Sequence, residues 1–146
     1  MFLGQFYHNI DEKGRLTVPA RFREQLNAEQ CILMKGFDQN LILITASIFD
    51  ILSQKLSVMS LTDRESRLLK RLIFSTANPV ELDRAGRILV PQFLRAAVGL
   101  ESEAVVVGVG DYIEIWSADE WSKQTEQIND AQLNADRFSA LDLATR

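Results

Sequence analysis

The sequence predicts a single β-rich α+β domain built from two internal repeats, and three observations support this. The stretch IDEKGRLTVP at residues 10–19 returns as LDRAGRILVP at residues 82–91. At this spacing of 72, residues 10–46 align without a gap with residues 82–118, and nine of the 37 pairs are identical. Composition alone would give about two identities. Short apolar runs separated by glycine, proline and aspartate favour strands joined by turns.

Each copy has the same expected order of elements. A strand enters the repeated turn and a short strand leaves it. Pro19 or Pro91 then occupies the first position of a short helix, where its missing N–H needs no partner. A β-hairpin follows. These elements are expected at residues 4–10, 15–18, 20–26 and 31–44 in the first copy, and at 78–82, 87–90, 92–98 and 104–116 in the second.

Further helices are expected after each hairpin. One begins at Ser47, and capping-box spacing predicts helix starts at Thr62 with Glu65 and at Ser117 with Glu120. The helix after Thr62 has an apolar stripe (Leu61, Leu68, Leu69, Leu72 and Ile73) and a basic face (Arg64, Arg67, Lys70 and Arg71). The stripe is either a subunit surface or part of the protomer's own core. The predicted organisation is one domain over 1–146, with repeat 1 at about 1–60, a connecting helix at 61–74, repeat 2 at about 75–121, and a C-terminal helix or tail at 122–146.

Charge is unevenly distributed along the chain. The net charge is −4, but residues 1–100 hold 13 basic and 10 acidic side chains, whereas residues 101–146 hold 3 and 10. The repeated turns therefore lie in the basic part of the chain, and local charge matters more than the total for docking on a phosphate backbone.

Several classes of site and location are not indicated by the sequence. No apolar run approaches the ~18 residues of a membrane span, and the first residues lack the basic start of a signal peptide, so we expect a cytoplasmic protein. The single Cys31 and the single His8 are expected to be packing residues. We expect no metal, no cofactor and no small-molecule substrate.

The repeated turn contains the residues that suggest function. Gly14 and Gly86 allow a tight reversal, and the short side chains of Asp11 and Asp83 can accept backbone N–H groups and hold the turn. Arg15 and Arg87 could simply form a salt bridge with these aspartates. The doubling favours a second interpretation, in which two guanidinium groups on symmetric loops contact phosphate or guanine on a long, regularly charged ligand.

The doubled motifs DEKGRLTVP and DRAGRILVP resemble the MraZ family of bacterial transcriptional regulators, as do MFLGQFYHNID at the start and IEIWSADEW in the second copy. The resemblance covers nearly the whole chain. It implies the SpoVT/AbrB-like fold, in which two halves interleave as a pseudo-two-fold swapped-hairpin barrel with peripheral helices. In AbrB two chains supply the halves, whereas here one chain would supply both.

The same resemblance implies function. The protein would bind double-stranded DNA at short G-rich direct repeats, upstream of a division and cell-wall gene cluster that includes its own gene. It would act there mainly as a repressor, associated with the nucleoid, and assemble into a homo-oligomeric ring. Several protomers on successive DNA repeats would gain avidity.

The DNA contacts implied by the resemblance are Arg15, Arg87 and Lys13, with Asp11 and Asp83 as turn partners. The second copy has Ala85 in place of Lys13, so either Arg84 compensates or this half binds more weakly. Three further arginines on the following helices either contact phosphate or remain solvated: Arg21, Arg23 and Arg95.

Two other functions also have to be compared with the sequence. An enzyme is disfavoured because the sequence contains no catalytic triad, metal cluster or phosphate-cradling loop, although Asp11, Asp83 and Glu12 are carboxylates near turns. A protein-binding module of antitoxin-like type remains the alternative, because the acidic C-terminal third could recruit a protein partner.

Overall fold

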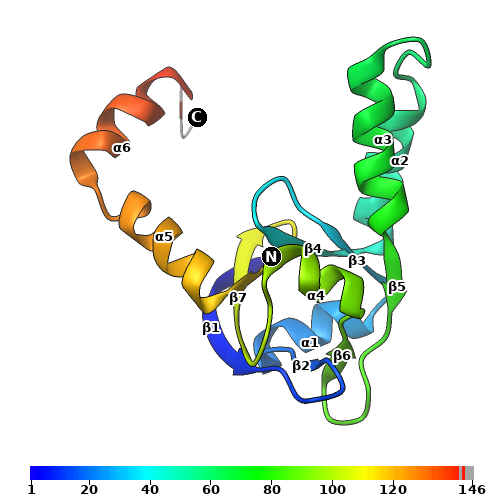
Figure 1. Cartoon of the computed structure of the whole chain (residues 1–146), viewed down its shortest axis with the longest axis vertical. Coiled ribbons are helices and arrows are strands. Elements are labelled where there is room, and N and C mark those ends of the chain that lie inside the picture. Colours follow the sequence, from blue (N-terminus) through cyan, green and yellow to red (C-terminus); the bar gives the residue numbers. More distant parts are fainter. Residues whose placement is uncertain (142, 144–146) are drawn as a thin grey trace.

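The two copies supply the same succession of elements (Figure 1). The computed structural model describes residues 1–141 and 143. The first copy contains β1 (Phe2–Asn9), β2 (Arg15–Thr17), α1 (Ala20–Asn27), β3 (Cys31–Lys35), β4 (Asn40–Thr45) and α2 (Ala46–Ser57). After α3 (Arg64–Thr76), the second copy contains β5 (Asn78–Val80), β6 (Arg87–Leu89), α4 (Gln92–Val98), β7 (Glu103–Gly110), β8 (Ile113–Ser117) and α5 (Ala118–Ile128). The chain continues with α6 (Ala131–Phe138) and a 3₁₀ turn at Ser139–Leu141.

Strand pairing crosses from one copy to the other. Six strands form an antiparallel sheet in the order β1-β7-β8-β4-β3-β5, so the first strand of each copy lies beside the third strand of the other. Strands β2 and β6, one from each copy, form a separate antiparallel pair. The predicted α+β class is thus confirmed, with antiparallel strands. The swapped-hairpin barrel and the repeat boundaries stay predictions.

The main core lies between the six-stranded sheet, the β2–β6 pair and the helices α1 and α4. Leu16 and Val18 from the first copy and Ile88 and Val90 from the second are buried at its centre. Phe22 on α1 contacts Phe2 and Phe6 of β1 through edge-to-face ring pairs with centroids 5.3 and 5.4 Å apart. The apolar residues that leave each turn therefore pack together, which places the two turns close to each other.

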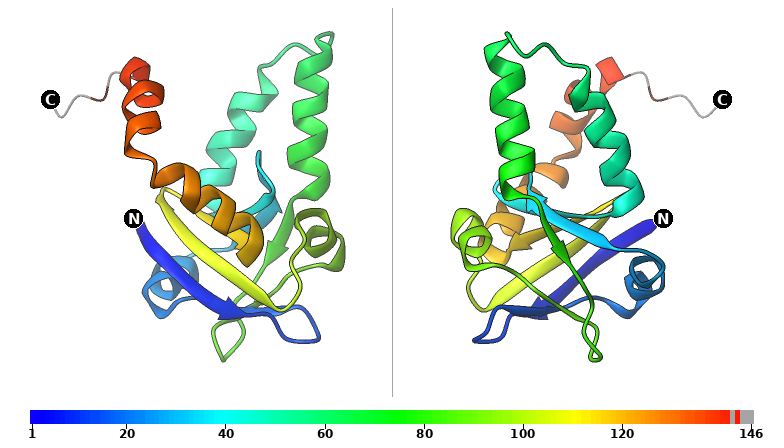
Figure 2. Two further views of the ribbon diagram at one scale, coloured as in Figure 1. Left: turned by 60° about the vertical axis from the view of Figure 1, so that its left-hand side comes forward. Right: turned by 90° about the vertical axis from the view of Figure 1, so that its right-hand side faces the viewer.

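Helices α2 and α3 form a hairpin that projects from the body, on the side opposite the turns (Figures 1 and 2). A second core runs from the sheet along the inside of this hairpin. Ile73 is buried near the sheet, Leu56 is buried near the outer end of α2, and Leu69 packs against this core. Leu61 and Leu68 are exposed. The predicted stripe is thus divided: Leu69 and Ile73 belong to the protomer's own core, whereas Leu61 and Leu68 face solvent.

Helices α5 and α6 form an arm that leaves the body beside β1 and β7 (Figure 1). The arm is anchored near its start by Trp121, whose ring packs on Trp116 and whose indole N–H donates to the side-chain carbonyl of Gln5 at 2.8 Å. Beyond this anchor, five large apolar side chains are exposed among the described residues: Ile128, Leu133, Phe138, Leu141 and Leu143. Part of the predicted tail, at 142 and 144–146, lies outside the described residues.

Four helix starts differ from the sequence-based expectation, and one agrees. Pro19 and Pro91 are N-cap residues with extended ψ values of 138° and 145°, because their carbonyls accept the first helical N–H bonds. Helix α2 begins at Ala46 rather than Ser47. Asp63, not Thr62, caps α3 by accepting from the Glu65 N–H, since a carboxylate one residue later reaches the same helix end. Ser117 caps α5 as predicted.

Among the described residues, no helix combines the length and the apolar character needed to cross a membrane.

Candidate nucleic-acid interface

The turn of the first copy is held by the side chain of Asp11. Its Oδ1 accepts the backbone N–H groups of Lys13 at 3.0 Å and Arg15 at 2.9 Å, and its Oδ2 accepts Nε of Arg15 at 2.6 Å. Gly14 has a φ of 86° and donates its N–H to the Asp11 carbonyl. A residue with a Cβ rarely adopts this backbone conformation, which explains the glycine.

The second copy reproduces this arrangement atom for atom. Oδ1 of Asp83 accepts from the N–H groups of Ala85 and Arg87, both at 2.9 Å, and Oδ2 accepts Nε of Arg87 at 2.9 Å. Gly86 has a φ of 76°. Each arginine is therefore oriented through its own backbone N–H and its Nε by one aspartate.

These contacts stabilise the charged form of both aspartates. The backbone hydrogen bond from Arg15 lowers the pKa of Asp11 below its usual range, and the bond from Arg87 does the same for the pKa of Asp83. Both carboxylates are consequently ionised at neutral pH, and each balances one of the two arginine charges. The salt bridge that the sequence offered as the simpler interpretation is present in both turns.

The two turns form one surface at the end of the body. Strands β2 and β6 pair with Arg15 opposite Leu89 and Thr17 opposite Arg87. The terminal nitrogen Nη1 of Arg87 lies 3.8 Å from Oδ2 of Asp11, so the charges of the two copies are in contact range. Figures 1 and 2 show both loops at the end of the molecule farthest from the α2–α3 hairpin.

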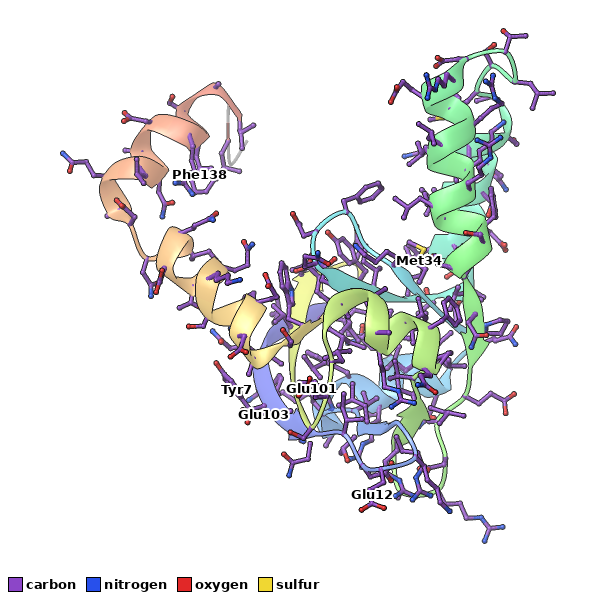
Figure 3. The ribbon with its side chains drawn as sticks, in the orientation of Figure 1. Tyr7, Glu12, Met34, Glu101, Glu103 and Phe138 are labelled. Atoms are coloured by element: carbon purple, nitrogen blue, oxygen red, sulfur yellow. The ribbon has the colours of Figure 1, made fainter. Side chains whose placement is uncertain are left out.

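Charged side chains at the tips of the turns differ between the copies. Lys13 and Arg84 are exposed, and so is Glu12, which Figure 3 shows at the outer edge of the first turn. The first turn is therefore neutral overall, whereas the second, with Ala85 and Arg84, carries one excess positive charge. Glu12 is a residue whose effect at this surface the sequence interpretation did not weigh.

The three arginines on the following helices occupy two different environments. Arg21 is exposed on α1. Arg23 and Arg95 are half-buried, and their Nε atoms donate to the carbonyls of Val18 and Val90 at 2.9 and 3.0 Å. The latter two are thus engaged inside the protein. Arg23 and Arg95 are an identical pair in the alignment of the two copies, and this pairing was the sequence signal for their shared role. The prediction of phosphate contacts did not take it into account.

The carboxylates of the described chain show no arrangement typical of catalysis. The aspartates of the turns have lowered pKa values, the opposite of a general acid. Burial raises the pKa of Glu114, but this carboxylate accepts the indole N–H of Trp116 at 3.1 Å and has a packing role. No cluster of three or more histidine, cysteine or acidic residues that could hold a metal occurs among the described residues.

The chain is β-rich, consists of two copies, and presents on one surface two Asp–Gly–Arg turns that their aspartates hold. These features place it in the class of pseudo-symmetric repeat proteins. The chain belongs to the MraZ family. The model of this family matches residues 1–72 and again residues 73–143. Its description reads MraZ protein and also calls the family antitoxin-like.

Relatives named transcriptional regulator MraZ cover most of the chain. The protein of Thermomicrobium roseum is 49% identical over 128 residues, which is 88% of this chain and 89% of the relative. That of Alkaliphilus metalliredigens is 44% identical over 88% of this chain and 90% of its own length. The protein of Finegoldia magna is 38% identical over 98% of this chain and 100% of its own length.

Proposed function

We propose that the chain is a sequence-specific DNA-binding transcriptional regulator, acting mainly as a repressor. Its targets are G-rich direct repeats upstream of a division and cell-wall gene cluster that includes its own gene. It acts in the cytoplasm, on the nucleoid. The names of its relatives support regulation of transcription. The paired turns support double-stranded DNA as the partner.

The observation that carries the proposal is the shared orientation of Arg15 and Arg87. In the described part of the chain, the side-chain hydrogen bonds of both arginines use Nε alone. The terminal nitrogens make no hydrogen bond among these residues, although Nη1 of Arg87 lies 3.8 Å from Oδ2 of Asp11. They can therefore serve a bidentate acceptor, such as guanine O6 and N7 or a phosphate. Because both side chains are already ordered, binding loses less conformational entropy than it would from free arginines.

The test is fluorescence anisotropy on the protein's own upstream DNA over a salt series, with Arg15→Ala, Arg87→Ala and the control Lys123→Ala. Lys123 is an exposed lysine on α5, where it pairs with Glu120 at 3.0 Å. Loss of one bidentate base contact should cost about 1–3 kcal/mol of specific binding. The control should bind like the wild type. If Arg15→Ala and Arg87→Ala both keep wild-type affinity, the arginines only brace the turns.

The turns also give an expectation for each copy. Lys13 and Arg84 are proposed as additional DNA contacts, one from each turn. Lys13→Ala and Arg84→Ala should each lower the slope of log affinity against log salt by about 1 if the lost contact is to phosphate. An unchanged slope with relaxed sequence preference would assign a base contact instead.

We further propose that the protein assembles with itself into a ring, and two uncovered surfaces support this. The arm carries exposed Leu133 and Phe138, and Figure 3 shows Phe138 at its outer part. On the α2 side of the sheet lies an apolar groove of about 360 Å³ lined by Met34, Ile42, Ile44, Ile48, Ile51 and Leu52. Two different complementary surfaces on one chain give a head-to-tail contact, which closes into a ring when the rotation permits.

Charge also favours the pairing of arm and helical hairpin. Residues 118–141 hold five acidic and two basic side chains, whereas α3 carries four basic residues. Light scattering after gel filtration should show a smaller assembly for Phe138→Ser than for wild type. An antitoxin-like module is the alternative use of the arm. In that case, removing residues 122–146 would leave the assembly unchanged and abolish capture of a protein partner.

A further inference from the structure

We propose that Arg23 and Arg95 are positioning residues, each of which holds the turn of the opposite copy in the shape that meets DNA. Only the reference to DNA rests on the function proposed above. The exchange of supports between the copies rests on contacts within the chain.

Arg95, from α4 of the second copy, supports the turn of the first copy. Its guanidinium lies against the Cα of Gly14, so that a Cβ built there would be 2.9 Å from Cζ of Arg95. A backbone hydrogen bond also joins the two copies here, because the N–H of Val90 donates to the carbonyl of Gly14 at 2.8 Å. The Nε of Arg95 then donates to the carbonyl of the same Val90 at 3.0 Å. Arg95, Val90 and Gly14 thus form a closed set of contacts.

Arg23, from α1 of the first copy, makes the mirror set. Its guanidinium lies against Gly86, where a Cβ would be 2.4 Å from Cζ of Arg23. The N–H of Val18 donates to the carbonyl of Gly86 at 2.9 Å, and the Nε of Arg23 donates to the carbonyl of Val18 at 2.9 Å. The same three kinds of contact recur 72 residues apart, which argues against an accidental approach.

The chemistry explains why these positions hold arginine and glycine. A guanidinium is flat, so it can lie face-on against a residue without a side chain while its edge donates to a carbonyl. A lysine ammonium has the same charge but neither the flat face nor the Nε donor. The glycine is required twice, by its positive φ and by the space that the guanidinium occupies.

This placement makes a different prediction from a phosphate contact. A cation that neutralises a phosphate can be replaced by lysine with modest loss, because the charge is what releases counterions. A brace cannot be replaced in this way. The neighbouring Arg21 is exposed on the same helix as Arg23 and provides a matched control.

The first experiment needs no DNA. Hydrogen exchange with mass spectrometry should be measured on the full chain for Arg95→Lys, Arg23→Lys and Arg21→Lys. Arg95→Lys should speed exchange in residues 11–15 and leave 83–87 near the wild-type rate. Arg23→Lys should do the reverse, and Arg21→Lys should change neither turn. Changes confined to each arginine's own copy, or no change, would overturn the proposal.

A second measurement connects the braces to binding. Affinity for upstream DNA should fall at least tenfold in Arg95→Lys and Arg23→Lys, with the salt slope unchanged from wild type. If both variants keep the wild-type affinity, these arginines contribute only positive charge to DNA binding and do not position the turns. If the wild type binds no such DNA but the crossed exchange pattern is found, the braces stand and the DNA-binding function fails. A further pair, Arg95→Gln and Arg23→Gln, keeps the exchange test decisive should a lysine variant fail to fold.

Discussion

Gly14→Ala gives the sharpest prediction about the stability of the turns. Gly14 has a φ of 86°, and an added Cβ would lie 2.9 Å from Cζ, Nε and Nη2 of Arg95. The backbone conformation alone costs about 1–2 kcal/mol for a residue with a side chain. Displacing the guanidinium end of Arg95 breaks its hydrogen bond to the Val90 carbonyl, which adds about 0.5–1.5 kcal/mol. The substitution should therefore lower the free energy of unfolding by about 1.5–3.5 kcal/mol.

Gly99→Ala is the matched control for this prediction. Gly99 has a φ of 68° and no atom within 4 Å of the position of an added Cβ, so only the backbone cost applies. Urea denaturation followed by tryptophan fluorescence, at one fixed protein concentration, compares the two variants. The double variant Gly14→Ala, Arg95→Ala should recover part of the loss, because the crowded atoms are removed. The reasoning fails if Gly14→Ala is no more destabilising than Gly99→Ala.

Three other predictions concern pH, thiol chemistry and the arm. Because the folded-state pKa values of Asp11 and Asp83 are lowered, their contribution to stability is present above the unfolded pKa of about 4 and is lost as pH falls through the folded values. An Asp11→Asn, Asp83→Asn variant should show a shallower loss of stability in acid titrations. Burial raises the pKa of the Cys31 thiol to about 11, so a thiol reagent at pH 8 should modify the native protein slowly and the urea-unfolded protein fast. Trp121→Phe removes the indole donor to Gln5 and should cost about 1 kcal/mol in thermal unfolding; no loss would mean that the bond does not anchor the arm.

The sequence predicted local structure well where local chemistry determines it. The helix at Gln92–Val98 matches the expected range, and the cap at Ser117 was visible as a Ser–Glu spacing of three. Turn geometry was also accessible, because an aspartate that can accept backbone N–H groups, followed by a glycine that can adopt a positive φ, is typical of a tight turn. The start of α3 was misplaced by one residue, since Thr62 and Asp63 are both good caps and only the three-dimensional structure distinguishes them.

Contacts between the copies could not be read from local patterns. The alignment identified Arg23 and Arg95 as equivalent, but it gave no sign that each lies against the glycine of the other copy. That information depends on the pairing of β2 with β6, which joins residues about 72 positions apart. The division of the α3 stripe into residues of the protomer's own core and exposed residues had the same cause, since it depends on where α2 lies.

The crossed pairing of strands has a consequence for the covalent link between the copies. Because β1 pairs with β7 and β5 with β3, neither half of the chain contains the neighbours that its own first strand requires. The loop at 58–63, at the exposed end of the helical hairpin, acts as a tether. A tether raises the local concentration of one half around the other without contributing to the interface. Cut there, the two fragments should each be unfolded alone and recover the native fold when mixed, at a rate set by their concentration.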